Sequence, residues 1–225
     1  MLKISALVSG GGTNLQSIID SMEGGRLNAS VTVVVSDNPD AYALERASRH
    51  GIKTEVLAAK GFASREAYDT ALAKVLKGYG AELIVMAGFM RILSRPMLEA
   101  FPMRIMNIHP ALLPSFPGLN VQKKALESGV KFSGCTVHFV DEGLDSGPII
   151  IQAVVPVKDN DTVETLSKRI LAEEHRIYPQ AIQLFSEGRL CIEGRRVFVK
   201  DCLEQDSAVE NPVVTIFNGT WKSRS

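Results

Sequence analysis

Short apolar runs alternate with segments of helical periodicity over the first half of the chain. Residues 2–8, 31–37 and 82–88 are apolar runs of strand length. Between them, residues 14–22 and 64–80 carry apolar side chains at helical spacing. Parallel strands need long crossover connections, usually helices. The alternation therefore predicts an α/β fold: an open, mostly parallel sheet of about seven strands, Rossmann-like, with helices on both faces.

The pattern changes in the second half. Residues 132–140 and 147–157 are two strand-like runs joined by a short polar segment, which predicts an antiparallel addition to the sheet. A long helical pattern follows, in which Pro179 should kink or break the helix. A small hairpin turning at Gly194 comes next. From Asp201 onward the chain is polar and weakly patterned, so we predict one domain over residues 1–200 and a tail over 201–225.

Composition limits the classes of partner. With 225 residues, 45% of them apolar, the chain can bury a core without metals or disulfides. Its 25 basic and 25 acidic residues cancel, so we predict neither a nucleic-acid nor a membrane partner. Three cysteines without CxxC spacing favour a reducing compartment, and residues 1–9 lack signal-peptide features, so a cytoplasmic location is predicted. The histidines are scattered and predict no metal site, and nothing indicates an oligomeric state.

The segment SGGGTN, residues 9–14, lies between the first predicted strand and helix. Glycines there allow backbone N–H groups to face a ligand, and a helix N-terminus favours an anion, so the segment can bind phosphate without a lysine. A dinucleotide site is the rival interpretation, with Asp37 as the ribose-binding acid, but Leu15 stands where a third glycine is needed. A glycine turn without a ligand also remains open.

A second candidate is RIMNIHPALLPSFPG, residues 104–118. Asn107 and His109 lie on the opposite pleat from Met106 and Ile108 in this strand, which Pro110 ends. In a sheet covered on both faces such groups need partners, and the crevice beyond the carboxyl ends of the strands provides access to a ligand. An amide can donate to a carbonyl oxygen, and an imidazole can move protons near neutral pH. The alternative is a structural pair that holds the proline-rich loop.

A carboxylate beside His109 would orient the imidazole and favour its protonated form. The candidates are Asp141, Glu142 and Asp145. Asp145 precedes Ser-Gly in a tight turn that could point it inward, whereas Asp141 and Glu142 are typical of a solvated turn. Sequence spacing alone does not bring His109 and Asp145 together.

Six motifs, in order and with similar spacing over residues 2–190, resemble the folate-dependent, single-domain glycinamide ribonucleotide (phosphoribosylglycinamide) formyltransferases. They are SGGGTNLQ, SREAYD, AGFMRILS, MNIHPALLPSFPG, TVHFVDEGLDSGPII and EEHRIYP. The resemblance implies the formyltransferase fold and a role in purine synthesis. It also implies transfer of a formyl group from 10-formyltetrahydrofolate, as co-substrate, to the amine of phosphoribosylglycinamide through a tetrahedral intermediate, with no metal.

The resemblance also implies the site residues. The catalytic residues would be Asn107, His109 and Asp145. The ribonucleotide would contact Gly12, Thr13, Asn14 and Glu174. The folate would contact Arg65, Met90, Arg91, Ile92, Leu93, Asn107, His138, Val140, Asp141 and Asp145. Gly11 departs from the family pattern, where a polar residue is common, and would make the loop looser.

Other functions stay open at this point. A formyltetrahydrofolate hydrolase or a methionyl-tRNA formyltransferase would use the same Asn-x-His and Asp set. The first is expected to carry an additional N-terminal domain and the second a basic C-terminal domain, so both are disfavoured for a neutral chain of this length. A nucleotide-binding module without catalysis is the alternative from a different class, and it does not explain why Asn107, His109 and Asp145 are all present. A nicotinamide dehydrogenase is disfavoured by Leu15.

Overall fold

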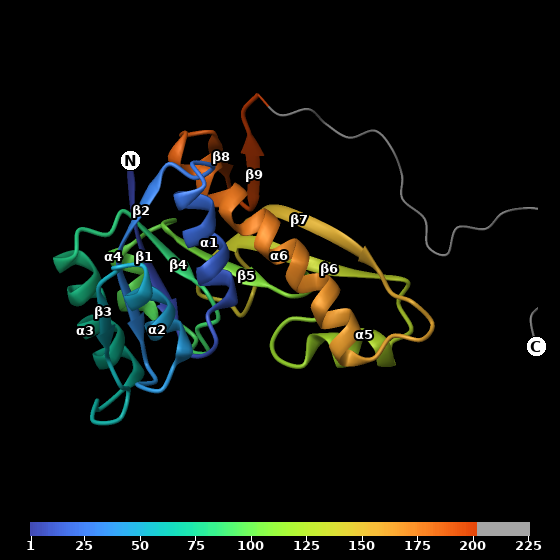
Figure 1. Cartoon of the computed structure of the whole chain (residues 1–225), viewed down its shortest axis with the longest axis horizontal. Helices are drawn as coiled ribbons and strands as arrows, with labels where there is room; N and C mark the ends of the chain where they lie inside the picture. The colour runs from blue at the N-terminus through green and yellow to red at the C-terminus, as the bar shows by residue number, and fades with distance from the viewer. Residues whose placement is uncertain (202–225) are drawn as a thin grey trace, which may run out of the picture.

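The predicted strands form one nine-stranded sheet in the computed structural model, which describes residues 1–201 (Figure 1). The strands are β1 (Leu2–Val8), β2 (Ala29–Ser36), β3 (Thr54–Val56), β4 (Leu83–Met86), β5 (Ile105–His109), β6 (Phe132–Phe139), β7 (Ile149–Pro156), β8 (Leu190–Glu193) and β9 (Arg196–Val199). The helices are α1 (Thr13–Glu23), α2 (Tyr42–Arg49), α3 (Arg65–Gly78), α4 (Arg95–Ala100), α5 (Val121–Glu127) and α6 (Val163–Ser186).

The strand order is β3-β2-β1-β4-β5-β6-β7-β9-β8, and β1 to β5 pair in parallel. β6 and β7 are antiparallel additions, as predicted. The predicted open, mostly parallel α/β sheet is therefore confirmed. It has nine strands, where about seven were predicted, because the C-terminal hairpin also joins it. That hairpin turns at Gly194 and pairs with β7 at Ile149.

Helices cover both faces of the sheet because the chain reverses direction across it. From β1 the chain moves outward to β2 and β3, then returns to β4 and β5 on the other side of β1. Right-handed crossovers then place α1 and α2 on one face and α3 and α4 on the other. Two hydrophobic clusters result, one that α1, α2, α5 and α6 cover and one that α3 and α4 cover.

The reversal leaves a crevice at the carboxyl ends of β1 and β4, where ligands bind in open α/β sheets. The loops that follow these two strands are joined there. The backbone N–H of Ser9 donates to the carbonyl of Gly88 over 3.1 Å, and the N–H of Met90 donates to the Ser9 hydroxyl over 3.0 Å. The glycine-rich loop after β1 and the loop after β4 therefore share one edge of the sheet.

Helix α6 is hydrogen-bonded to both β4 and β5. The hydroxyl of the fully buried Tyr178 lies 3.1 Å from the carbonyl oxygen of Met86 and 2.9 Å from that of Met106. Burial raises the pKa of Tyr178 well above its usual value, so the hydroxyl keeps its proton. Of the predicted kink or break at Pro179, the break is wrong, since α6 continues to Ser186, and the kink stays a prediction. Packing of the buried residues around the proline outweighs the one hydrogen bond that its missing N–H removes.

Of the predicted tail, Asp201 alone is described, and residues 202–225 lie outside the described part of the chain. The tail and the domain boundary therefore stay predictions. Within residues 1–201, no helix is both long and apolar enough to span a bilayer.

Candidate active site

The polar residues of β5 face away from the core cluster beneath α6. Met106 and Ile108 belong to that cluster, so the alternating pleat turns Asn107 and His109 to the opposite face. Antiparallel pairing with β6 places His138 beside Asn107 and Thr136 beside His109. Two strands thus bring an amide and two imidazoles together at one place on the sheet.

The proline-rich loop after β5 is bound to the same face. The Thr136 hydroxyl donates to the carbonyl of Ala111 over 2.7 Å and accepts from the N–H of Leu113 over 3.1 Å. The side-chain amide of Gln152 on β7 donates to the carbonyl of Leu113 over 2.9 Å. These bonds fix the loop as it turns back over His109.

His109 is held between two acceptors and is 5% exposed. Its Nε2 lies 2.9 Å from the carbonyl oxygen of Phe116, and its Nδ1 lies 3.4 Å from Oδ2 of Asp145. Since a carbonyl and a carboxylate both accept, each ring nitrogen needs a hydrogen for both contacts to be favourable. The sequence analysis expected a carboxylate beside this ring, and Asp145 lies there.

Both acceptors are presented by backbone in the left-handed region. Phe116 has a φ of 55° and Asp145 a φ of 50°, a conformation that costs about 1–2 kcal/mol for a residue with a Cβ. The N–H of Gly118 donates to Oδ2 of Asp145 over 2.9 Å and fixes the carboxylate. A Cβ at Gly147 would lie 1.8 Å from the carbonyl oxygen of Phe139, so only glycine fits this turn. Asp145 therefore points inward, as predicted.

His138 is neutral and orients Asn107. Burial lowers the pKa of His138, while the carbonyl of Phe139, 2.8 Å from Nδ1, and the more distant charge of Asp145 act in the opposite direction. The carbonyl can only accept, so Nδ1 carries the hydrogen and Nε2 accepts from the side-chain amide of Asn107 over 3.3 Å. Asn107 then keeps its second amide hydrogen for a ligand. The 3.9 Å approach of His138 Nε2 to Asp145 Oδ1 joins a neutral ring to a carboxylate and is not an ion pair.

The glycine-rich loop is held against α2. The carbonyl of Gly10 accepts from the N–H of Ala43 over 3.0 Å. Gly12, with a φ of 70°, precedes α1, and a Cβ on it would lie 2.5 Å from the Cβ of Ala43. Added Cβ atoms at Gly10 and Gly11 would meet nothing within 4 Å. Close approach to α2 therefore requires glycine at position 12 alone.

Two of the residues predicted to bind the ribonucleotide meet, although they are far apart in sequence. The side-chain amide of Asn14, in the first turn of α1, donates to the Glu174 carboxylate on α6 over 2.7 Å. Burial raises the pKa of Glu174, and the hydrogen bond from Asn14 partly opposes that shift. Within residues 1–201, the buried Oδ1 of Asn14 has no hydrogen-bond partner. This unpaired acceptor suits a ligand that brings its own hydroxyl donor.

The segments predicted to bind folate carry three exposed apolar side chains, Met90, Ile92 and Leu144, which we call the apolar rim. Met90 is 72% exposed, Ile92 52% and Leu144 52%, whereas Leu93 is buried. The guanidinium of Arg91 lies 4.7 Å from the centre of the Tyr68 ring. Exposed apolar side chains beside a polar cluster suit a ligand with a flat apolar body and a polar reacting group.

Three other residues predicted to bind folate, Val140, Asp141 and Arg65, form hydrogen bonds or ion contacts outside the group of Asn107, His109, His138 and Asp145. The N–H of Val140 donates to the carbonyl of Ile105 over 2.9 Å, which ties the loop after β6 to β5. Asp141 accepts from the N–H of Gly143 and the hydroxyl of Ser146 and so stabilises its own turn. Arg65, at the start of α3, has a half-exposed side chain that lies 4.0 Å from Glu66. Its role in folate binding stays a prediction.

Sequence reasoning missed the carbonyl of Phe116. It is a backbone group, and no residue pattern indicates where a carbonyl will point.

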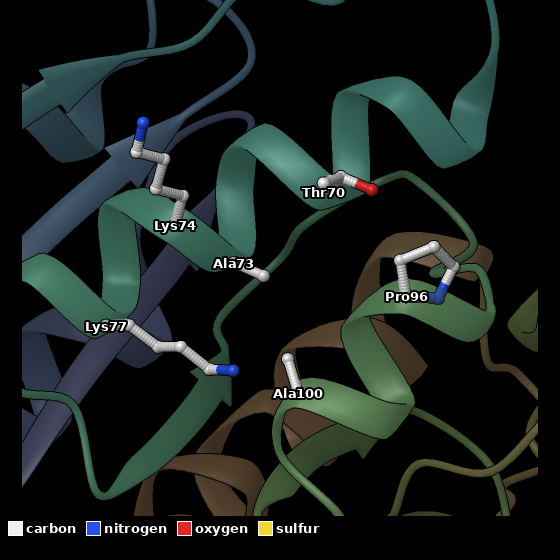
Figure 2. Close-up of a pocket in the computed structure, with 6 residues that line it drawn as sticks. All are labelled: Thr70, Ala73, Lys74, Lys77, Pro96 and Ala100. Carbon is white, nitrogen blue, oxygen red and sulfur yellow. The ribbon is translucent and has the colours of Figure 1, made fainter.

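Other groups in the described residues do not form a rival catalytic site. No three His, Cys, Asp or Glu residues within residues 1–201 are grouped to hold a metal. Burial raises the pKa of Cys135 to about 12, which keeps its thiol protonated and unreactive. A groove of about 300 Å³ between α3 and α4 is lined by two lysines but by no acid or imidazole (Figure 2). Its other lining residues are threonine, proline and alanine.

Comparison with known proteins gives one consistent result. Residues 2–182, which include all the predicted site residues, match the family model described as formyl transferase. The chain is 45% identical over 189 residues to the phosphoribosylglycinamide formyltransferase of Escherichia coli, covering 84% of this chain and 89% of that protein. It is 46% identical over 192 residues, 84% of this chain, to a trifunctional purine biosynthetic protein of Drosophila melanogaster, but spans 14% of that protein's length.

Solved structures agree. A glycinamide ribonucleotide transformylase from Symbiobacterium toebii superposes with a TM-score of 0.87 at 59% identity, covering 88% of this chain and 94% of that one. A phosphoribosylglycinamide formyltransferase from Coxiella burnetii gives a TM-score of 0.84 at 41% identity, over 88% of this chain and 93% of that one.

Proposed function

The chain belongs to the formyl transferase family, and we propose that it transfers the formyl group of 10-formyltetrahydrofolate to the amine of phosphoribosylglycinamide in purine synthesis. The observation that carries this proposal is the arrangement around His109. Its ring is held between Asp145 and a backbone carbonyl, beside an amide of Asn107 that keeps one free hydrogen. These groups provide two donors and a proton carrier at one place.

The first step is attack by the substrate amine on the formyl carbon. A C–N bond forms, and the electron pair of the C=O bond moves to oxygen, which becomes an oxyanion. The free amide hydrogen of Asn107 and the Nε2–H of His109 donate to that oxygen. Removal of one such donor typically raises the activation free energy by about 3 kcal/mol. The oxyanion has to take the place of the Phe116 carbonyl at Nε2, because that carbonyl lies 2.9 Å from the same nitrogen.

The second step breaks the bond between the formyl carbon and N10 of the folate. The attacking nitrogen loses one proton and N10 gains one, so the proton count balances. His109, held by Asp145, assists this transfer, directly or through water. No group on the protein forms a covalent bond with the formyl carbon. The buried, protonated thiol of Cys135 is unsuited to that role.

The two substrates approach from different sides of the polar cluster. We assign the ribonucleotide to the glycine-rich loop and α6, through Gly12, Thr13, Asn14 and Glu174. The folate is assigned to the apolar rim, with Arg65, Met90, Arg91, Ile92, Leu93, His138, Val140 and Asp141. The joined loops after β1 and β4 support this arrangement, since they bring the two regions to one edge.

We also propose a cytoplasmic enzyme with small-molecule substrates and no nucleic-acid partner. The equal numbers of acidic and basic residues support the last point, since no excess of positive charge is available for a nucleic-acid backbone.

The test is to identify the product. Purified protein is incubated with 10-formyltetrahydrofolate, labelled in the formyl carbon, and phosphoribosylglycinamide, and the label is followed by mass spectrometry. We expect it in the formylated ribonucleotide, and at a much lower rate with Asp145→Asn. Label released as formate alone would instead identify a hydrolase. If the formyl folate stayed unreacted, the protein would be a nucleotide-binding module without catalysis.

A further inference from the structure

The guanidinium of Arg46 contacts the glycine-rich loop and forms no ion pair with any carboxylate of residues 1–201. Arg46 on α2 donates from Nε to the carbonyl of Gly11 over 2.8 Å and from Nη1 to the side-chain oxygen of Gln16 over 3.2 Å. Its guanidinium also lies 4.9 Å from the centre of the Tyr42 ring. Among the residues that the structure describes, no acidic side chain forms an ion pair with Arg46, whereas Arg49, one turn later, pairs with Glu45.

Helix α2 therefore binds two consecutive carbonyls of the loop. The N–H of Ala43 binds the carbonyl of Gly10, and Arg46 binds that of Gly11. In a planar trans peptide, the C=O of one residue and the N–H of the next point in opposite directions. The N–H groups of Gly11 and Gly12 consequently face away from α2. They form one anion-binding surface with the free N–H groups at the start of α1.

The positive charge of Arg46 also favours an anion at the loop. Its hydrogen-bond partners, the Gly11 carbonyl and the Gln16 side chain, are neutral and do not offset this charge. The side chain is only partly exposed, so solvent screens the charge incompletely. An anion on the N–H side of the loop meets this field in addition to the helix dipole. A neutral ligand would gain from neither.

We propose that Arg46 is a positioning residue that sets the specificity of the ribonucleotide site for a phosphate group. It aligns the loop N–H groups through the Gly11 carbonyl, and its uncompensated charge favours the phosphate dianion over a neutral hydroxyl. The inference rests on the proposed function for the identity of the substrate. It adds a residue from α2 to a site that the sequence motifs assigned to the loop, α1 and α6.

The test compares two substrates in Arg46→Gln: phosphoribosylglycinamide and the corresponding ribonucleoside, which lacks the phosphate. We expect KM for the ribonucleotide to rise about 10- to 100-fold with kcat nearly unchanged. The kcat/KM for the ribonucleoside should change little, because it has no anion to lose. Arg46→Lys should restore part of the affinity. Arg49→Gln on the same helix is the matched control and should behave as wild type.

Two results would overturn the proposal: an unchanged KM for the ribonucleotide, or an equal loss for both substrates, which would mean a general structural role. If Arg46→Gln does not fold, the two substrates are compared in Arg46→Lys instead. Calorimetric titration of ribose 5-phosphate, which needs no turnover, separates this proposal from the proposed function. Weaker binding in Arg46→Gln supports the anion site even if wild type transfers no formyl group. Equal binding in the two proteins refutes it even if wild type is active.

Discussion

Substitution of Gly12 by alanine tests how the shape of the glycine-rich loop supports ligand binding. The new methyl group would lie 2.5 Å from the Cβ and 2.8 Å from the Cα of Ala43, well inside van der Waals contact. Gly12 also has a φ of 70°, which residues with a Cβ rarely adopt. The loop must therefore move away from α2, or α2 must move from the loop.

The cost follows from these two effects. The left-handed conformation costs about 1–2 kcal/mol for alanine, and forcing a methyl group into a packed contact costs about 1–3 kcal/mol. Alanine also lowers the conformational entropy of the unfolded chain, which stabilises the folded state by about 0.4–1 kcal/mol. We expect a net loss of about 1–5 kcal/mol in the free energy of unfolding. If the shifted loop also loses one N–H bond to a phosphate, at about 1.5–3 kcal/mol, KM for the ribonucleotide rises about 10- to 150-fold.

Urea unfolding measures the first quantity, and steady-state kinetics at saturating folate measures the second. Gly10→Ala is the matched control, because a Cβ there meets nothing within 4 Å and the φ of Gly10 is not positive. Wild-type stability and KM in Gly12→Ala would refute the steric argument. Reduced stability with an unchanged KM would place the phosphate away from this loop.

Three further results are expected. Replacing His109 or Asp145 by asparagine should lower kcat by about 100- to 10,000-fold, with binding of a folate analogue, followed by fluorescence, nearly intact; a variant with normal turnover would remove that residue from the mechanism. Tyr178→Phe should lower the free energy of unfolding in urea by about 1–3 kcal/mol, because two buried carbonyls lose their shared donor; no loss would mean that the hydroxyl contributes nothing. Burial lowers the pKa of His138 below 6.5, so beneath that pH the unfolded chain binds a proton that the folded chain does not. The free energy of unfolding should therefore fall as the pH drops through 6.5 toward the folded pKa, and His138→Gln should flatten this slope; an identical slope would contradict it.

Periodicity in the sequence was sufficient to predict the class of fold. The apolar runs and the helical segments between them indicate a parallel sheet covered by helices, since alternating strands and helices bury their apolar faces against each other in that way. The same pleat argument placed Asn107 and His109 on one face, and the structure has them there, with the imidazole and Asp145 in contact. Their catalytic roles stay predictions.

Contacts between segments far apart in the chain were beyond sequence reasoning. The Phe116 carbonyl reaches His109 because Thr136 and Gln152 bind the proline-rich loop to the sheet, and no local pattern encodes that path. Arg46 was likewise missed, since one arginine in a polar helix is usually a solvated residue. The break considered at Pro179 does not occur, because burial against the sheet keeps α6 continuous although local propensity disfavours proline there.

The most direct test of the central claim is the rate at which 10-formyltetrahydrofolate disappears with and without phosphoribosylglycinamide. The claim is that the amine, and not water, attacks the formyl carbon beside Asn107 and His109. The account predicts rapid loss of the formyl folate when the ribonucleotide is present and almost none when it is omitted. Equal rates in both reactions would contradict the account and identify water as the acceptor.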